Sequence, residues 1–280
     1  MQVQWYPGHM TKTRRQLEDR LRQVQIVIDV LDARAPAASS NPDLAALFAG
    51  KTVLHVLNKA DLADPQTTAR WIRYFTDRDE MAVPYSVPHD KAQLLKDEIM
   101  HAAQQLLAHY EEKGARRILR GLVAGVPNVG KSAILNRLLG TRRMEEGNRP
   151  GVTRSLQWAK VDPYLEILDS PGLLWPKFES EEVGATLALL GSVKLEILDE
   201  EELACYLIRL LKKADPQALM RRYDLENLDG EPYEILEQIS RRRGFLVRGG
   251  EADTERGAKM LLSEFRDGKL GRLSLEVPPG

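Results

Sequence analysis

The chain has 280 residues, enough for one large domain or two modest ones with substantial cores. A formal net charge of -1 neither demands nor excludes a nucleic-acid partner. The single cysteine, Cys205, excludes a disulfide framework and a cysteine-based metal site. No signal-peptide pattern is present and no apolar run approaches the ~18 residues of a membrane span, so we expect a cytoplasmic protein with no membrane partner.

The first ten residues are aromatic and turn-forming. Trp5-Tyr6-Pro7-Gly8-His9-Met10 precedes a charged helix that we expect from Thr11 to about Gln23. This segment is either a docked arm or a functional loop. Considered alone, His9 is more often a surface or packed histidine than a functional one.

An apolar run, Gln25–Asp32, is typical of a buried parallel strand. It ends in Asp32-Ala33-Arg34-Ala35-Pro36, and parallel strands commonly carry function at their carboxyl ends. Asp32 and Arg34 can orient a ligand or partner, or they can form a local ion pair that fixes the loop. The sequence leaves both possibilities open.

A second strand, Thr52–Leu57, is followed by Asn58-Lys59-Ala60-Asp61, which fits the Asn-Lys-x-Asp guanine-reading motif. Asp61 can accept hydrogen bonds from N1–H and the exocyclic amino group of guanine, whereas adenine has an acceptor at N1 and no amino group beside it. Asn58 can contact the base or the phosphate loop, and Lys59 can lay its alkyl stem over the ring. The motif therefore predicts a guanine site.

The next elements complete one half of the expected sheet. A helix around residues 65–78 is followed by the strand Ala82–Val87 and a long helix from Lys91 to Lys113. Many GTPases have Ser-Ala-Lys after this strand, in a loop that closes over the base. This chain has Ser86-Val87-Pro88, so only Ser86 carries over as a base-site residue.

The stretch Gly125–Ser132 reads Gly-Val-Pro-Asn-Val-Gly-Lys-Ser and fits the G-x-x-x-x-G-K-[ST] phosphate loop at every fixed position. It follows the apolar strand Ile118–Ala124 and leads into a helix that ends at Gly140, which is the context that this motif requires. Lys131 can reach the β- and γ-phosphates. The residues expected to bind phosphate are Asn128, Val129, Gly130, Lys131, Ser132 and Ala133.

Three further residues complete the expected phosphate and metal site. Thr153 lies in a polar, glycine-containing segment and is the candidate to join Ser132 in ligating Mg²⁺ when a γ-phosphate is present. The strands 155–161 and 164–168 lead to Asp169-Ser170-Pro171-Gly172. Asp169 can hold Mg²⁺ through water, and the Gly172 amide can meet the γ-phosphate.

The order of these motifs is unusual, because the guanine motif precedes the phosphate loop, the reverse of a Ras-like GTPase. We therefore predict a circularly permuted α/β P-loop GTPase domain over residues 1–178, with a mostly parallel sheet and helices on both faces. A mainly helical domain, a candidate for RNA binding, is expected over residues 179–280. Because the segment after Gly172 runs into this second region, γ-phosphate contacts can reposition it directly.

The C-terminal region has helical periodicity through residues 177–244 and again from Thr254 to Phe265. An acidic run, Asp199–Glu202, favours a helix N-terminus at Leu203. Residues 273–277 are expected to form a short strand or tail. The cationic residues here form either an RNA-facing surface or a solvated helical face; they are Arg221, Arg222, Arg241, Arg242, Arg243, Arg248, Lys259, Arg266 and Lys269.

With the permuted order, the Trp5–Met10 segment, Asp32-Ala33-Arg34 and the phosphate loop, the chain resembles the YlqF/RbgA family, ribosome biogenesis GTPase A. The resemblance extends over nearly the whole chain. It implies a GTPase that uses GTP and Mg²⁺ in late assembly of the large ribosomal subunit, with the subunit precursor and its ribosomal RNA as partners.

The resemblance also bears on catalysis. Ras-type enzymes orient the attacking water with a Gln after the motif's glycine, but Leu173 follows Gly172 here. The family resemblance suggests that His9 replaces it when the protein sits on its ribosomal partner; the alternative is a group supplied by that partner. Asn128 matches GTPases activated by K⁺, where it helps hold the ion, although it can equally be a turn residue.

Two other functions remain open at this stage. Leu173 makes a non-catalytic guanine-nucleotide sensor plausible, and the chain can also be a GTPase in another RNA process. The absence of a second catalytic constellation in the sequence argues against an RNA-modifying enzyme. We expect a monomer.

Overall fold

The computed structural model describes residues 17–104, 106–108, 118–140, 157–170, 172, 174, 178–193 and 199–279. Its six-stranded sheet has the order β3-β2-β1-β4-β6-β5, and every neighbouring pair is parallel except β5 and β6. The strands are β1 (Ile26–Asp32), β2 (Thr52–Asn58), β3 (Met81–Tyr85), β4 (Leu119–Ala124), β5 (Gln157–Asp162) and β6 (Leu165–Asp169).

The helices that accompany the sheet are α2 (Pro36–Ser39), α3 (Pro42–Leu47), α4 (Pro65–Thr76), α5 (Ala92–Ala102) and α7 (Lys131–Leu139). Those of the C-terminal region are α8 (Glu181–Leu189), α9 (Glu200–Ala214), α10 (Pro216–Tyr223), α11 (Pro232–Arg242) and α12 (Thr254–Arg266). Helix α5 is shorter than the helix predicted to Lys113, because a turn at Ala103 interrupts it. Helix α9 starts before the predicted Leu203, since the side chain of Asp199 caps it and the glutamates fill its first turn.

Alternating strand residues bury both faces of the sheet. Leu31 and Leu57 pack with Trp71 and Phe75 of α4. Their neighbours in the chain, including Val30, belong to the main buried cluster on the other face, where α5 and α7 pack together. Central strand β1 is buried along its whole length, as expected for a parallel strand covered on both sides.

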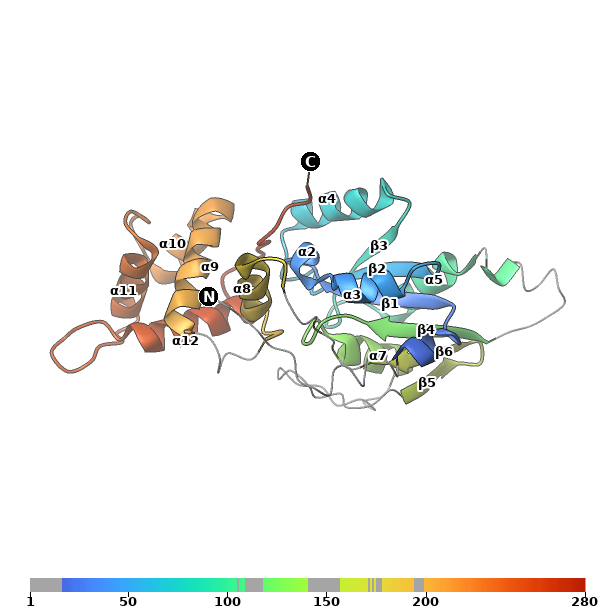
Figure 1. The fold of residues 1–280 in the computed structure, drawn as a ribbon. Helices are drawn as coiled ribbons and strands as arrows, with labels where there is room; N and C mark the ends of the chain where they lie inside the picture. Colours follow the sequence, from blue (N-terminus) through green and yellow to red (C-terminus); the bar gives the residue numbers. More distant parts are fainter. Residues whose placement is uncertain are drawn as a thin grey trace.

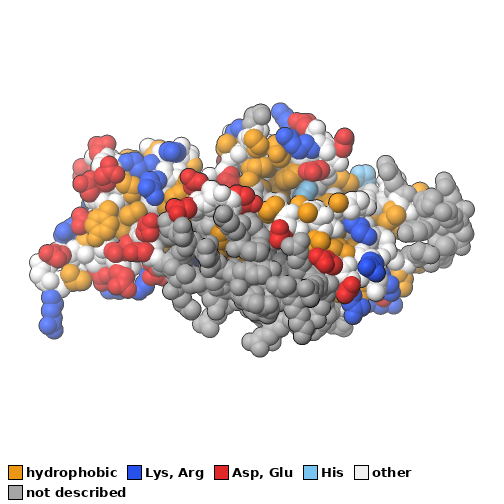
Figure 2. Space-filling view, viewed as in Figure 1, with side chains coloured by type: hydrophobic (Ala, Val, Ile, Leu, Met, Phe, Trp, Pro, Cys, Tyr) orange, Lys and Arg blue, Asp and Glu red, His pale blue; other side chains and the backbone are white. Residues whose placement is uncertain are grey.

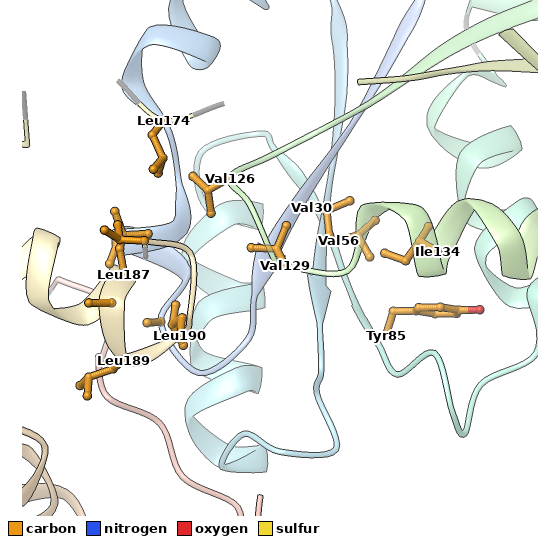
Figure 3. Close-up of a cluster of buried hydrophobic side chains, with 14 of the residues drawn as sticks. Val30, Val56, Tyr85, Val126, Val129, Ile134, Leu174, Leu187, Leu189 and Leu190 are labelled. Atoms are coloured by element: carbon orange, nitrogen blue, oxygen red, sulfur yellow. The ribbon is translucent and has the colours of Figure 1, made fainter. Parts of the chain in front are cut away.

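Helix α8 lies between the sheet and helices α9–α12 (Figure 1). It packs against α2 on one side and α9 on the other. Figure 3 shows Val129, from the loop after β4, between Val30 of the sheet and Leu187 of α8. Loop, sheet and α8 therefore share one apolar core. After α12 the chain returns to the neighbourhood of α4 (Figure 1).

Candidate functional site

The predicted nucleotide motifs meet at the carboxyl edge of the sheet. Strands β1 and β4 are neighbours, and the chain extends from them toward opposite edges of the sheet. Ligands of open α/β sheets bind in the crevice outside the carboxyl ends of the strands at such a switch point. The loops that follow β1, β2, β4 and β6 carry Asp32, Asn58, the Gly125–Ser132 stretch and Asp169, so parallel register collects them there.

The backbone of the phosphate loop requires its glycines. Gly125 and Gly130 have φ of 143° and 101°, in the left-handed region that other residues rarely adopt. A Cβ at Gly125 would overlap the carbonyl of Val30, and one at Gly130 would overlap the side-chain amide of Asn58. Gly130 is also the N-cap of α7, whose first turn holds Ser132 and Ala133. The loop thus ends at a helix N-terminus, a favourable place for phosphate.

Lys131 and Asp169 form the charged floor of this site. The ammonium of Lys131 donates to the Val126 carbonyl at 2.7 Å, folding back over the loop. Burial lowers the pKa of Lys131 to about 8, and the carboxylates of Asp169 and Asp29 oppose that shift. Burial likewise raises the pKa of Asp169 to about 6, with Lys131 opposing it. A bound phosphate would favour the charged form of Lys131 and raise its pKa.

The side chains of Ser132 and Asp169, at the phosphate loop, are suited to binding Mg²⁺. Both carboxylate oxygens of Asp169 are buried, and among the described residues neither accepts a hydrogen bond of ordinary geometry, although the backbone amide of Ser170 lies near the carboxylate. Buried carboxylates are usually satisfied, so this pair of oxygens indicates a missing cationic or water partner. A hydroxyl and a carboxylate that reaches the ion through water are typical Mg²⁺ partners in phosphate sites, and Ser132 and Asp169 supply them.

The loop after β2, Asn58–Asp64, is called the base-reading loop below. Its first two side chains bond the phosphate loop: Asn58 Nδ2 donates to the Val129 carbonyl at 2.7 Å, and Lys59 Nζ donates to the Asn128 carbonyl at 2.8 Å. Asn58 Oδ1 is buried and unpaired among the described residues. These two bonds lock the base-reading loop to the phosphate loop, so both halves of a nucleotide would be held in a fixed geometry.

Asp61 is bonded by Ser86, the residue that the sequence analysis placed near the base site. The Ser86 hydroxyl donates to Asp61 Oδ1 at 2.7 Å, and the Ser86 amide donates to Asp90 Oδ2 at 2.7 Å. Sequence reasoning did not single out Asp90, nor His89, whose Nε2 lies 3.8 Å from Asp61 Oδ2. No sequence pattern points to either residue, because their contacts depend on the loop between β3 and α5.

The alternatives for Asp32 and Arg34 are resolved in favour of an ion pair. Arg34 donates to both carboxylate oxygens of Asp32 at 2.9 Å, and Lys59 Nζ donates to Oδ2 at 2.8 Å. Burial by itself would raise the pKa of Asp32, but Arg34 and Lys59 outweigh it and hold that pKa well below its usual range. Asp32 is thus a buried anchor for Lys59 of the base-reading loop.

The phosphate loop also bonds the turn after α8, a connection that the sequence analysis missed. Asn128 Nδ2 donates to the Gly191 carbonyl at 2.5 Å, and the buried Ser192 hydroxyl donates to the Pro127 carbonyl at 2.7 Å. Gly172 packs closely against the phosphate loop, since a Cβ at Gly172 would be 2.6 Å from Pro127 Cα. In the sequence, a Gly-Ser pair after a run of leucines indicates only the end of a helix. The pattern therefore gave no indication that this turn bonds the phosphate loop.

Most of the predicted cationic surface is paired within the protein. Glu264 binds Arg222 at 2.6 Å and Arg243 at 3.7 Å, and Arg266 donates to the last carbonyls of α8. Short-range partners also engage Arg221, Arg241, Arg242, Lys259 and Lys269. Acidic and basic side chains accordingly intermix over these helices in Figure 2. These intramolecular pairings therefore favour a solvated helical face over one continuous cationic surface.

Two predicted site residues, His9 and Thr153, lie outside the described residues. Within the described ranges, no cluster of three or more His, Cys, Asp or Glu side chains is arranged to hold a metal ion. Among the same residues, no helix combines the length and apolarity needed to cross a bilayer.

Comparisons with known proteins agree with this geometry. Residues 120–243 match the family described as "50S ribosome-binding GTPase". The chain is 41% identical to Ribosome biogenesis GTPase A of Bacillus cereus, over 99% of this chain and 95% of that protein. For the Thermotoga maritima protein of the same name, the identity is 34% over 99% of this chain and 95% of that protein.

Solved structures resemble the whole arrangement. A GDP-bound structure of TM YlqF superposes with a TM-score of 0.70 at 30% identity, covering 94% of this chain and 99% of that one. GNP-bound YlqF from T. maritima gives a TM-score of 0.68 at 30% identity, covering 95% and 98%. The prediction of a permuted P-loop GTPase fold with a helical C-terminal region is confirmed.

Proposed function

This chain belongs to the ribosome biogenesis GTPase A family, and we propose that its hydrolysis of GTP drives a late step in assembly of the large ribosomal subunit. The nucleotide site rests on the bonding of the base-reading loop to the phosphate loop through Asn58 and Lys59, and the assembly role is inferred from the near-full-length relatives named Ribosome biogenesis GTPase A. Its partners are the subunit precursor and its ribosomal RNA, which it meets in the cytoplasm as a monomer.

Each site residue has a chemical task in this proposal. Asp61, held by Ser86, reads the guanine edge, and Lys131 with the loop amides binds the phosphates. Ser132, Thr153 and Asp169 would hold Mg²⁺, which would neutralise phosphate charge when bound. The Gly172 amide would meet the γ-phosphate, a role supported by the close approach of Gly172 to Pro127 of the phosphate loop.

Nucleotide state switches docking through the turn after α8. The bonds from Asn128 to Gly191 and from Ser192 to Pro127 tie the phosphate loop to the C-terminal helices. In the GTP state these helices favour docking on the precursor, and hydrolysis favours release. Amide hydrogen exchange in residues 178–279 should therefore differ between GDP and a non-hydrolysable GTP analogue; identical exchange would contradict the switch.

Leu173 cannot align the attacking water by hydrogen bonding, so another group must do so. We assign this role to His9, which would orient the attacking water while the protein is bound to its ribosomal partner. A His9→Ala variant should keep nucleotide affinity but lose the turnover stimulated by the partner. Unchanged stimulated turnover would indicate that the partner supplies the group.

Potassium is the remaining cofactor of the proposal. Asn128 engages Gly191 with its amide nitrogen, so the side-chain oxygen is the atom that would ligate K⁺ beside the phosphates. Left-handed backbone at Asn128, with φ of 63°, is a conformation that asparagine tolerates better than most residues. Higher GTP turnover in K⁺ than in Na⁺ at equal ionic strength is expected.

The central test measures GTP hydrolysis with purified large or small ribosomal subunits, each in K⁺ and in Na⁺ buffer. Stimulation by large subunits and not by matched small subunits supports the assembly role. Equal turnover with either particle, or with none, would overturn the large-subunit proposal. It would point to another RNA partner for this GTPase.

A further inference from the structure

The C-terminal tail, residues 268–276, runs from the end of α12 back to the sheet and lies along the base-reading loop. Leu273 is buried there, and a side chain at Gly268 would overlap Leu62 of that loop. Four hydrogen bonds join the two segments: Arg272 Nε to the Ala63 carbonyl at 3.0 Å, Arg272 Nη2 to the Ala60 carbonyl at 3.0 Å, Leu273 N to the Leu62 carbonyl at 2.9 Å and Asp64 N to Ser274 Oγ at 3.2 Å.

Arg272 acts as a clamp around Asp61. Its two carbonyl partners, Ala60 and Ala63, lie on either side of the Asp61-Leu62 pair, so one planar guanidinium fixes the backbone before and after the guanine-reading carboxylate. The fork of an arginine suits two acceptors at a fixed spacing, whereas a lysine ammonium is a single point donor.

The tail beyond Arg272 is anchored independently. Leu275 N donates to the Arg34 carbonyl at 2.7 Å, and the Glu276 carboxylate accepts from the amides of Ala37 and Ala38 at 2.9 and 3.1 Å. Trp71 of α4 donates to the Glu276 carbonyl at 3.4 Å. These anchors hold the tail in place if Arg272 alone is changed, so its effect on the base-reading loop can be isolated.

We propose that Arg272 is a positioning residue for guanine recognition, holding the Ala60–Ala63 backbone so that the Asp61 carboxylate faces the base edge. The inference rests on the proposed role of Asp61 as the guanine reader. Ser86 fixes the Asp61 side chain from one side, and Arg272 fixes its backbone from the other. Ordering the loop in advance removes part of the entropy cost of binding.

A structural role alone predicts a different result from a positioning role. The Arg272 side chain is exposed, its bond to the Ala60 carbonyl is exposed and its bond to the Ala63 carbonyl is part-buried, so we expect its removal to change stability little. Guanine discrimination should change, because it depends on where Asp61 points. Inosine diphosphate reports this directly, since hypoxanthine lacks the 2-amino group that Asp61 accepts from.

The test uses full-length Arg272→Ala and Arg272→Lys, with Arg221→Ala as the matched control on α10. Affinities for fluorescent GDP and IDP, turnover at saturating GTP and the unfolding midpoint are measured for each. Both Arg272 variants should bind GDP about tenfold more weakly, the loss of one well-placed charged hydrogen bond, and their GDP-to-IDP preference should fall toward one. Turnover at saturation and the unfolding midpoint should stay close to those of Arg221→Ala.

Asp61→Asn separates the two possible failures. If Asp61→Asn abolishes the GDP-to-IDP preference while Arg272→Ala retains it, the positioning role is wrong and the guanine site stands. If Asp61→Asn also retains the preference, Asp61 does not read guanine, and both the site assignment and the role of Arg272 are overturned.

Discussion

Replacing Asp32 by asparagine removes the negative charge that faces Arg34 and Lys59. The substitution preserves size, but it places an NH₂ group where a carboxylate oxygen accepts. Whichever way the amide is oriented, that NH₂ meets donors, since Oδ1 binds Arg34 Nε and Oδ2 binds both Arg34 Nη2 and Lys59 Nζ. Two cations then lose their counter-charge in the same step.

The loss of folding stability in Asp32→Asn depends on how well each unpaired cation can be hydrated. Removing one partner of a buried ion pair typically destabilises a protein by about 3–5 kcal/mol. The side chain of Arg34 is only 2% exposed and cannot be hydrated, whereas that of Lys59 is 25% exposed and recovers part of its hydration. We therefore expect the low end, about 3 kcal/mol. With a denaturant slope of about 3 kcal/mol per M of urea, the midpoint should fall by about 1 M.

Urea unfolding followed by tryptophan fluorescence measures this shift. The matched control is Asp224→Asn, which removes a carboxylate that is 96% exposed and 3.5 Å from Arg242. An exposed pair contributes about 0–1 kcal/mol, so its midpoint should move by less than about 0.3 M. A shift for Asp32→Asn no larger than that of the control would refute the view that Asp32 compensates two buried charges.

Three other changes have defined outcomes. Asp61→Asn should weaken GDP binding by at least about a hundredfold and favour xanthosine diphosphate, measured with fluorescent nucleotides, because an amide donates where a carboxylate accepts. Gly130→Ala should abolish nucleotide binding by displacing Asn58, whereas Gly50→Ala, with open space around its Cβ position, should retain it in the same assay. Burial raises the pKa of Glu276 to about 7 from 4.5, so the native state holds a proton that the unfolded state releases and stability falls as pH rises between these values. Melting temperatures of Glu276→Gln should match the parent near pH 5 and exceed it above pH 7; a constant difference would contradict this.

The mostly parallel sheet and the strand ends that carry the motifs could be predicted from the sequence, because both depend on local pattern. The apolar run before the phosphate loop and the glycines within it specify a strand, a turn and a helix in only one arrangement. Parallel register then brings Asn58 to the phosphate loop. The strand, turn and helix follow from residues that are neighbours in the chain, and the approach of Asn58 to the phosphate loop follows from the rules of sheet topology.

Contacts between distant segments could not be predicted in the same way. Ser192 follows a leucine-rich helix, and nothing around it distinguishes a hydroxyl that bonds Pro127 from one that faces solvent. The sequence left the role of Asp32 undecided between ligand and ion pair, since Lys59 reaches it only in the folded sheet. The sequence left the cationic residues near the C-terminus undecided between an RNA-facing surface and a solvated helical face, because charge counts cannot reveal that Glu264 pairs with both Arg222 and Arg243.

The bond between Arg272 and Ala60 spans 212 positions of the chain. Synthesis of the chain therefore produces the base-reading loop 212 positions before the guanidinium that bonds it. During that interval the carbonyls of Ala60 and Ala63 lack the bonds that Arg272 donates in the folded protein. If Arg272 positions Asp61 as proposed, a nascent chain that ends before residue 272 should bind guanine nucleotides more weakly than a chain that includes it.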